Sequence, residues 1–228
     1  MKGVKFGDIH SWNDLGLILE PFVVPPAIPK TNLLDIPAGD GSLDLTEALG
    51  VIRYHDRELV FNFTVNPLSK MTFDEKITQV SNALNGRAFN IILDRDPDWY
   101  WEGRCIVNEH LQNKIIGRIV VKAIVRPYKL RHEITTHKLD VYTASSTGKY
   151  TAIVVNNGRK PVVPEIEVGD IPIKFEFEGK TYFVYEHYTK AFPDLQLKEG
   201  ENEITIYDYP GVGDYTTYMN LKFREGAL

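Results

Sequence analysis

Three short stretches hold residue types that could bind a metal ion or a phosphate group. Residues 35–50, DIPAGDGSLDLTEALG, combine glycines with acidic side chains, as metal-binding and phosphate-binding loops do. The stretch HEITTH holds two imidazoles, as zinc-binding helices do: His132 and His137. A third stretch has carboxylates at alternate positions, like the start of a calcium loop: Asp94, Asp96 and Asp98. Each stretch is tested by the spacing that its chemistry requires.

None of the three has that spacing. The two histidines are five residues apart, so on a helix their rings would point about 140° apart instead of sharing a face. A calcium loop needs Gly at its sixth and Glu at its twelfth position, where this chain has Trp99 and Cys105. The glycine pairs at 39–41 and 211–213 lack both the third glycine of a dinucleotide fingerprint and the Lys-Ser/Thr of a phosphate loop. We therefore predict turns at the two glycine pairs and an acidic turn at Asp94, Asp96 and Asp98 that could hold an adventitious ion at most. We predict no bound metal or cofactor.

Nucleophilic catalysis has no support in the sequence. Cys105 lies in RCIVNEH, where it alternates with apolar positions, so we predict a small core residue and not a thiolate. There is no G-x-S-x-G motif. Carboxylate pairs for glycoside hydrolysis depend on three-dimensional spacing, and the sequence singles none out. We therefore predict that the protein is not an enzyme. A cell-wall hydrolase is the enzyme class that we considered, and the sequence contains no motif that supports it.

Composition narrows the class of protein further. The 228 residues carry a formal net charge of −5, and no run of Lys or Arg exceeds two, which argues against a general nucleic-acid binder. A single cysteine excludes an intramolecular disulfide framework. The first residues show no apolar signal-peptide region and the apolar runs are shorter than a membrane span, so we expect synthesis in a cytoplasm and no membrane segment.

The elements expected in the first half are strands and one helix. ELVFNFTVN alternates apolar and polar residues, as a half-buried strand does, and AFNIILD, WYWEGRCIVNEH and IGRIVVKAIVRPY predict further strands joined by turns at RDPD and LQNK. MTFDEKITQVSNALNGR predicts an amphipathic helix that packs on the sheet. Thr72 and Glu75 have capping-box spacing, and Gly86 follows the last turn. The apolar face of this helix comprises Phe73, Ile77, Val80 and Leu84.

The second half predicts a β-sandwich. Short alternating strands are separated by turn residues every ~8 to 12 positions, and IPIKFEFEGKTYFVYEH is a hairpin that turns at Glu178-Gly179. The polar stretch 128–148 either links two units or opens a second sheet. The expected fold class is mainly β, with an N-terminal β-sandwich domain that carries one α-helix and an arm at 1–128, and a C-terminal β-sandwich at 129–228.

Residues 35–50 then have a structural interpretation. Turn residues stand at the centre of the stretch, and Leu43 and Leu45 alternate with Ser42, Asp44 and Thr46. This pattern indicates an extended arm that is anchored by one face and does no chemistry.

The motifs in the first half resemble a known family. In order along the chain, MKGVKFGDIHSWNDLGLIL, DIPAGDGSLDLTEALG-VIRYHDRELVFNFTV, the helix and LNGRAFNIILDRDPDWYWEGRC look like the distal tail protein (Dit) family of phages and prophages of Gram-positive bacteria. The resemblance is close over about the first 128 residues. VVNNGRKPVVPEIEV and LQLKEGENEITIYDYPG are similar to the galectin-like sandwich that follows in many members.

This resemblance implies a structural virion protein at the distal tip, or baseplate, of a phage tail. Members form a homo-hexameric ring that joins the major tail tube protein to the tail-tip hub, a tail-associated lysin-like protein, and the C-terminal sandwiches can carry receptor-binding proteins. DNA passes through the lumen without specific binding, which a net negative charge suits. The arm would then form the oligomer interface, through Asp40, Gly41, Ser42, Leu43, Asp44 and Leu45. Its carboxylates would discourage wrong pairing.

A second function class also has support in the composition of the second half. Aromatic faces stack on apolar faces of ligands, so the tyrosines there favour a carbohydrate-binding module that contacts the host cell wall. The alternative explanation is that tyrosine is an ordinary strand residue. The tyrosines in question are Tyr182, Tyr185, Tyr188, Tyr207, Tyr209, Tyr215 and Tyr218.

Overall fold

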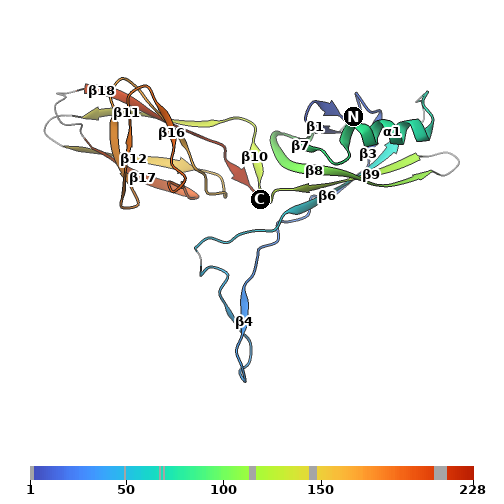
Figure 1. The fold of residues 1–228 in the computed structure, drawn as a ribbon, viewed down its shortest axis with the longest axis horizontal. Coiled ribbons are helices and arrows are strands. Elements are labelled where there is room, and N and C mark those ends of the chain that lie inside the picture. Colours follow the sequence, from blue (N-terminus) through green and yellow to red (C-terminus); the bar gives the residue numbers. More distant parts are fainter. Residues whose placement is uncertain are drawn as a thin grey trace. The chain divides into compact units, whose positions relative to one another are not determined.

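The structure is a computed structural model that describes residues 3–48, 50–66, 68, 70–112, 117–143, 148–207 and 215–228 (Figure 1). The chain divides into two compact units, Met1–Lys129 and Leu130–Ala227. The mainly β fold predicted from the sequence is confirmed, because both units are built from strands and the described residues contain one helix. None of the helical segments among these residues is long and apolar enough to cross a membrane.

The first unit is built on an antiparallel sheet. Its strand order is β2-β1-β7-β8-β9-β6-β3. On β6, Leu59, Phe61 and Phe63 are fully buried and their neighbours are not, so the alternation in the sequence marks the core face. The strands are β1 (Val4–Phe6), β2 (Ile9–His10), β3 (Leu17–Leu19), β6 (Arg57–Val65), β7 (Ala88–Leu93), β8 (Asp96–Gln112) and β9 (Gly117–Val125).

The helix α1 (Phe73–Leu84) packs on the core face of this sheet, as predicted. Val80 and Leu84 belong to the same buried cluster as the β6 side chains. The capping box is present, because the Glu75 amide donates to Thr72 Oγ1 at 3.3 Å and the Thr72 amide donates to Glu75 Oε2 at 2.8 Å. The sequence did not predict the burial of Lys76, whose Nζ donates to the Leu15 carbonyl at 2.9 Å.

The turn before β8 differs from the prediction. RDPD was expected to be the turn, but β7 and β8 are joined through Asp94 and Arg95, and β8 begins at Asp96. The register shifts here, so that Ile92 pairs with Tyr100 while Leu93 pairs with Asp96. A bulge absorbs the intervening residues, which allows a proline within the strand. Of the predicted LQNK turn, Leu111 and Gln112 lie in β8 and the other two residues lie outside the described ones.

The second unit is a sandwich of two four-stranded sheets. One has the order β11-β18-β13-β16 and the other β12-β17-β14-β15. A single apolar cluster draws on both sheets, with Ile166 and Leu221 from the first and Phe175 and Ile204 from the second. The strands are β11 (Thr135–Thr143), β12 (Lys149–Asn156), β13 (Glu165–Val168), β14 (Ile173–Phe177), β15 (Lys180–Val184), β16 (Thr189–Ala191), β17 (Gly200–Tyr207) and β18 (Tyr215–Phe223).

The stretch 128–148 and the hairpin at Glu178-Gly179 can now be compared with the predictions from the sequence. The polar stretch 128–148 opens a sheet, because it contains β11. The hairpin at Glu178-Gly179 is confirmed: β14 pairs with β15, and φ is +47° at Glu178 and +75° at Gly179. Positive φ at both central residues belongs to the tight turn that matches strand twist. The short strands β10 (Lys129–Arg131) and β19 (Gly226–Ala227) pair with each other.

Candidate functional site

The residues that first suggested metal chemistry have structural partners. Asp94 accepts from the Gly3 amide at 2.6 Å and lies 3.2 Å from His10 Nε2. Asp96 pairs with Lys129 Nζ at 2.6 Å. Among the residues that the structure describes, no three His, Cys, Asp or Glu side chains are grouped as metal ligands would be. The acidic turn therefore ties strands together.

The histidine and cysteine candidates are structural as well. The His137 ring stacks on Phe223 with 5.7 Å between the centroids and 9° between the planes, and His132 lies in the bend before β11. Cys105 is fully buried on β8, and burial raises the pKa of its thiol to about 12, which keeps it protonated. The GVG segment at 211–213 lies outside the described residues.

Residues 35–50 belong to a β-hairpin that begins earlier than the sequence indicated. β4 (Leu33–Asp35) pairs with β5 (Ser42–Asp44) as a separate two-stranded sheet (Figure 1). Further hydrogen bonds continue the pairing, from the Lys30 amide to the Arg53 carbonyl and from the His55 amide to the Ile28 carbonyl. We call residues 28–55 the arm. Every described residue from 28 to 44 is exposed.

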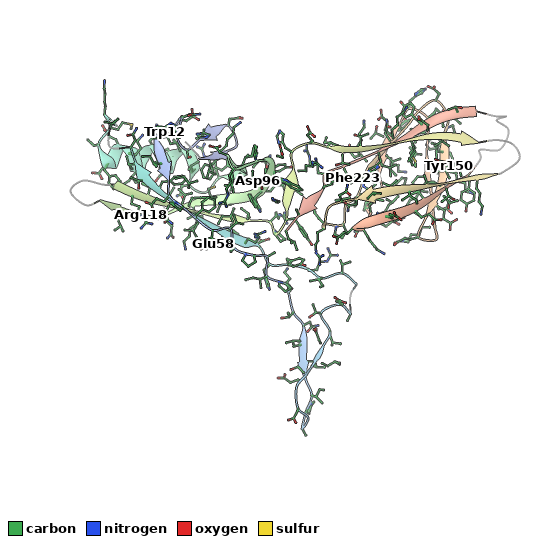
Figure 2. The ribbon with its side chains drawn as sticks, turned by 180° about the vertical axis from the view of Figure 1, so that it is seen from behind. Trp12, Glu58, Asp96, Arg118, Tyr150 and Phe223 are labelled. Atoms are coloured by element: carbon green, nitrogen blue, oxygen red, sulfur yellow. The ribbon has the colours of Figure 1, made fainter. Side chains whose placement is uncertain are left out.

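The two faces of the arm differ in chemistry. Leu34 and Leu43 are direct cross-strand partners, so their side chains share one face. They are 57% and 50% exposed, although Leu43 was expected to be anchored. Asp35 and Ser42 lie on the other face, where Ser42 Oγ donates to Asp35 Oδ1 at 2.8 Å. Side chains project outward from both sides of the ribbon (Figure 2).

Hydrogen bonds at Asp44 and turn geometry at Gly41 define the conformation at the end of the arm. The Thr46 amide donates to Asp44 Oδ1 at 2.8 Å, and the side-chain and backbone hydrogen bonds from Thr46 lower the pKa of Asp44. Gly41 has φ +80°, as the turn prediction requires, and Ala38 has φ +59°. The structure brings all six residues, Asp40, Gly41, Ser42, Leu43, Asp44 and Leu45, to the end of the arm and the strand that leaves it.

The base of the arm is held by buried groups of the first unit. Arg57 is buried; its Nη1 donates to the Pro127 carbonyl at 3.1 Å and its Nη2 donates to the Pro25 carbonyl. Burial lowers the pKa of this guanidinium. Phe22 packs edge-on against Phe61 with the centroids 5.1 Å apart. The arm thus combines a fixed base with an unpaired apolar face.

Apolar side chains are concentrated on and beside the arm. Residues 20–55 form a small part of the chain but hold many of its exposed large apolar residues: Val23, Ile28, Leu33, Leu34, Ile36, Leu43 and Val51. Exposed apolar surface of this kind marks an interaction site. The apolar residues of FVVPPAIPKTNLLDI could have indicated this exposed surface. The prolines in the stretch interrupt the alternation of apolar and polar residues by which a strand is recognised.

Comparison with known proteins supports a specific fold. No protein-family model matches the sequence, and no curated protein matches it. Among solved structures, the chain is similar to the crystal structure of the Dit (gp 19.1) protein of phage SPP1, described as a paradigm of the hub adsorption apparatus in phages that infect Gram-positive bacteria. The TM-score is 0.66 at 12% sequence identity, and the match covers 98% of this chain and 99% of that one. The chain therefore has the fold of the SPP1 Dit protein, as the resemblance in its motifs predicted.

Proposed function

We propose that the protein is a structural component of a phage tail and forms a homo-hexameric ring at the distal end of the tail tube. The observation that carries this proposal is the match to the SPP1 Dit protein over nearly the whole of both chains. In this role the ring joins the tube protein to the tail-tip hub, and the second unit is a galectin-like platform to which receptor-binding proteins attach.

The arm supports the ring physically. A closed ring needs a heterologous interface, in which one surface of each copy meets a different surface of the next. The arm offers such a surface, because Leu34 and Leu43 present an apolar face and its strand edges can pair with another chain. In this proposal the interface contains Asp40, Gly41, Ser42, Leu43, Asp44 and Leu45. Asp40 and Glu47, which have no side-chain hydrogen bond within the described residues, discourage edge-to-edge aggregation.

Charge fits the lumen of such a ring. A net charge of −5 gives no sequence-independent attraction for DNA phosphates, so DNA would slide through without binding. The role requires no catalytic residue, no cofactor and no membrane.

The test is the absolute mass of the purified chain. Light scattering behind size exclusion, at several concentrations, should give about 156 kDa for six copies of a 26.0 kDa chain, or twice that for paired rings, with rings in negative-stain images. The double variant L34D/L43D places charges on the apolar face and should give monomers. I153D places a charge on an exposed apolar side chain of β12, outside the proposed interface, and should keep the ring.

If the chain is a monomer in solution, a second assay is needed, because binding to neighbouring tail proteins can drive the assembly of the ring. The gene is replaced in a phage by one that lacks residues 35–50, and tails are scored for the protein. Incorporation of the shortened chain would show that the arm is not the interface. Failure of the full-length chain to enter tails would overturn the proposed function.

A further inference from the structure

The structure separates the tyrosines of the second unit into two groups. Tyr182 is buried and lies 3.3 Å from Asp194 Oδ2, and the Tyr207 hydroxyl donates to Glu176 at 2.5 Å, so these two are structural. Tyr218 is half-buried on β18, whereas Tyr209 and the side chain of Tyr215 lie outside the described residues. Tyr185 and Tyr188 differ, because their side chains are 61% and 65% exposed.

These two tyrosines extend a row of aromatic rings from the sheet surface. Phe183 lies on the outer face of β15, and its ring meets Tyr185 edge-on with the centroids 4.8 Å apart. The Tyr185 and Tyr188 centroids are 6.4 Å apart at an interplanar angle of 64°. We call Phe183, Tyr185 and Tyr188 the aromatic row. Each ring braces the next, which limits the side-chain entropy that a ligand would have to remove.

The backbone beneath the row is fixed by hydrogen bonds. The Tyr188 amide donates to the Tyr185 carbonyl at 3.3 Å, which closes a turn over residues 185–188. Two further bonds tie this turn to the neighbouring segment: the His187 amide donates to Gly169 at 3.0 Å, and the Val168 amide donates to the Tyr188 carbonyl at 3.3 Å. His187 has φ +58°, a conformation held by these contacts. The turn is therefore a pre-organised support.

Polar groups flank the rings. His187 Nε2 lies 3.9 Å from Asp170 Oδ1, and both side chains are exposed beside the turn. Glu186, within the turn, is exposed too. A carboxylate accepts hydrogen bonds, and an imidazole can donate and accept. Rigid exposed rings with such groups at their edge match a ligand that has an apolar face and hydroxyls around it.

We propose that the aromatic row is a binding site for a saccharide, in which separate C–H faces of the ligand stack on Tyr185 and on Tyr188 while its hydroxyls bond to Asp170, Glu186 and His187. A protein partner is the competing occupant, and it needs about 800 Å² of surface on each side. Among the described residues of this unit, the other exposed large apolar residues, Ile134, Ile153 and Val163, belong to segments other than the row. A surface of three rings with charged side chains at its edge is smaller than a protein interface requires and favours the saccharide.

The site is tested by saturation-transfer NMR on the full chain. The probes are chitohexaose, maltohexaose and cellohexaose, followed by a printed glycan array. At least one saccharide should bind, and Y185A/Y188A should weaken its affinity at least ten-fold. Y185F/Y188F, which keeps the rings, should weaken it less. I153A, which removes an exposed apolar side chain from β12, should leave this affinity unchanged.

Each remaining result would overturn the proposal. Binding to no glycan, or binding that Y185A/Y188A leaves intact, shows that the row is not a saccharide site. Loss of a protein partner in Y185A/Y188A, without any glycan ligand, assigns the surface to a protein interface. Melting temperatures check that the variants fold. The mass of the chain tests the ring separately, since the row and the arm lie in different units.

Discussion

At the scale of single residues, Cys105 shows how burial removes reactivity. Its thiol is fully buried on β8, and the raised pKa of about 12 leaves almost no thiolate at neutral pH. We expect no reaction with a disulfide reagent in the native protein and one thiol per chain in denaturant, measured by absorbance. T78C, at an exposed position of α1, should add one thiol that reacts at once. Rapid native labelling of the unaltered chain would contradict the buried position.

At the scale of elements, the start of α1 is stabilised by the capping box. T72A removes the Thr72 hydroxyl bond and should lower the free energy of unfolding of the first unit by about 1 kcal/mol, measured by urea denaturation. T78A makes the same substitution at an exposed position inside the helix. It removes no cap, so it should be neutral or slightly stabilising. Equal effects of the two variants would show that the cap contributes nothing.

The same element predicts a pH dependence. Hydrogen bonds from the Thr72 backbone and side chain lower the pKa of Glu75 below its ordinary value of 4.5. A depressed carboxyl pKa stabilises the fold above the ordinary value, and this contribution is lost as pH falls through the lowered pKa of the folded state. The stability difference between the unaltered chain and T72A should therefore narrow in acid.

Elements were predictable where local chemistry determined them. The alternation of β6, the cap of α1 and the Glu178-Gly179 hairpin each depend on residues within a few positions of one another. The bulge at the start of β8 was missed, because Pro97 in a run of aspartates is typical of a turn. The burial of Lys76 was missed because its acceptor, the Leu15 carbonyl, is far away in the sequence.

The candidate site was predictable in part for the same reason. The end of the arm followed from DIPAGDGSLDLTEALG, but its first strand did not, because β4 follows a proline-rich segment without alternation. The exposed pair Tyr185 and Tyr188 could not be separated from buried Tyr182 by residue type. Exposure depends on which side of β15 each residue lies and on where that strand ends.

At the scale of the whole molecule, each unit has its own apolar cluster. Phe61 lies in one and Phe175 in the other, and both are fully buried. An apolar cluster of this size can stabilise a unit without the other. Proposed roles divide in the same way, with ring formation in the first unit and ligand binding in the second.

Separate clusters predict separate unfolding transitions in calorimetry. F61A should destabilise the first unit by about 3–5 kcal/mol, since it deletes a buried ring and leaves a cavity, and should leave the second transition unmoved. F175A should do the reverse. Each variant is the control for the other, and I153A on the surface should shift neither transition. If both core variants displaced one common transition by the same amount, the two units would unfold as a single cooperative body. The prediction of separate transitions would then be wrong.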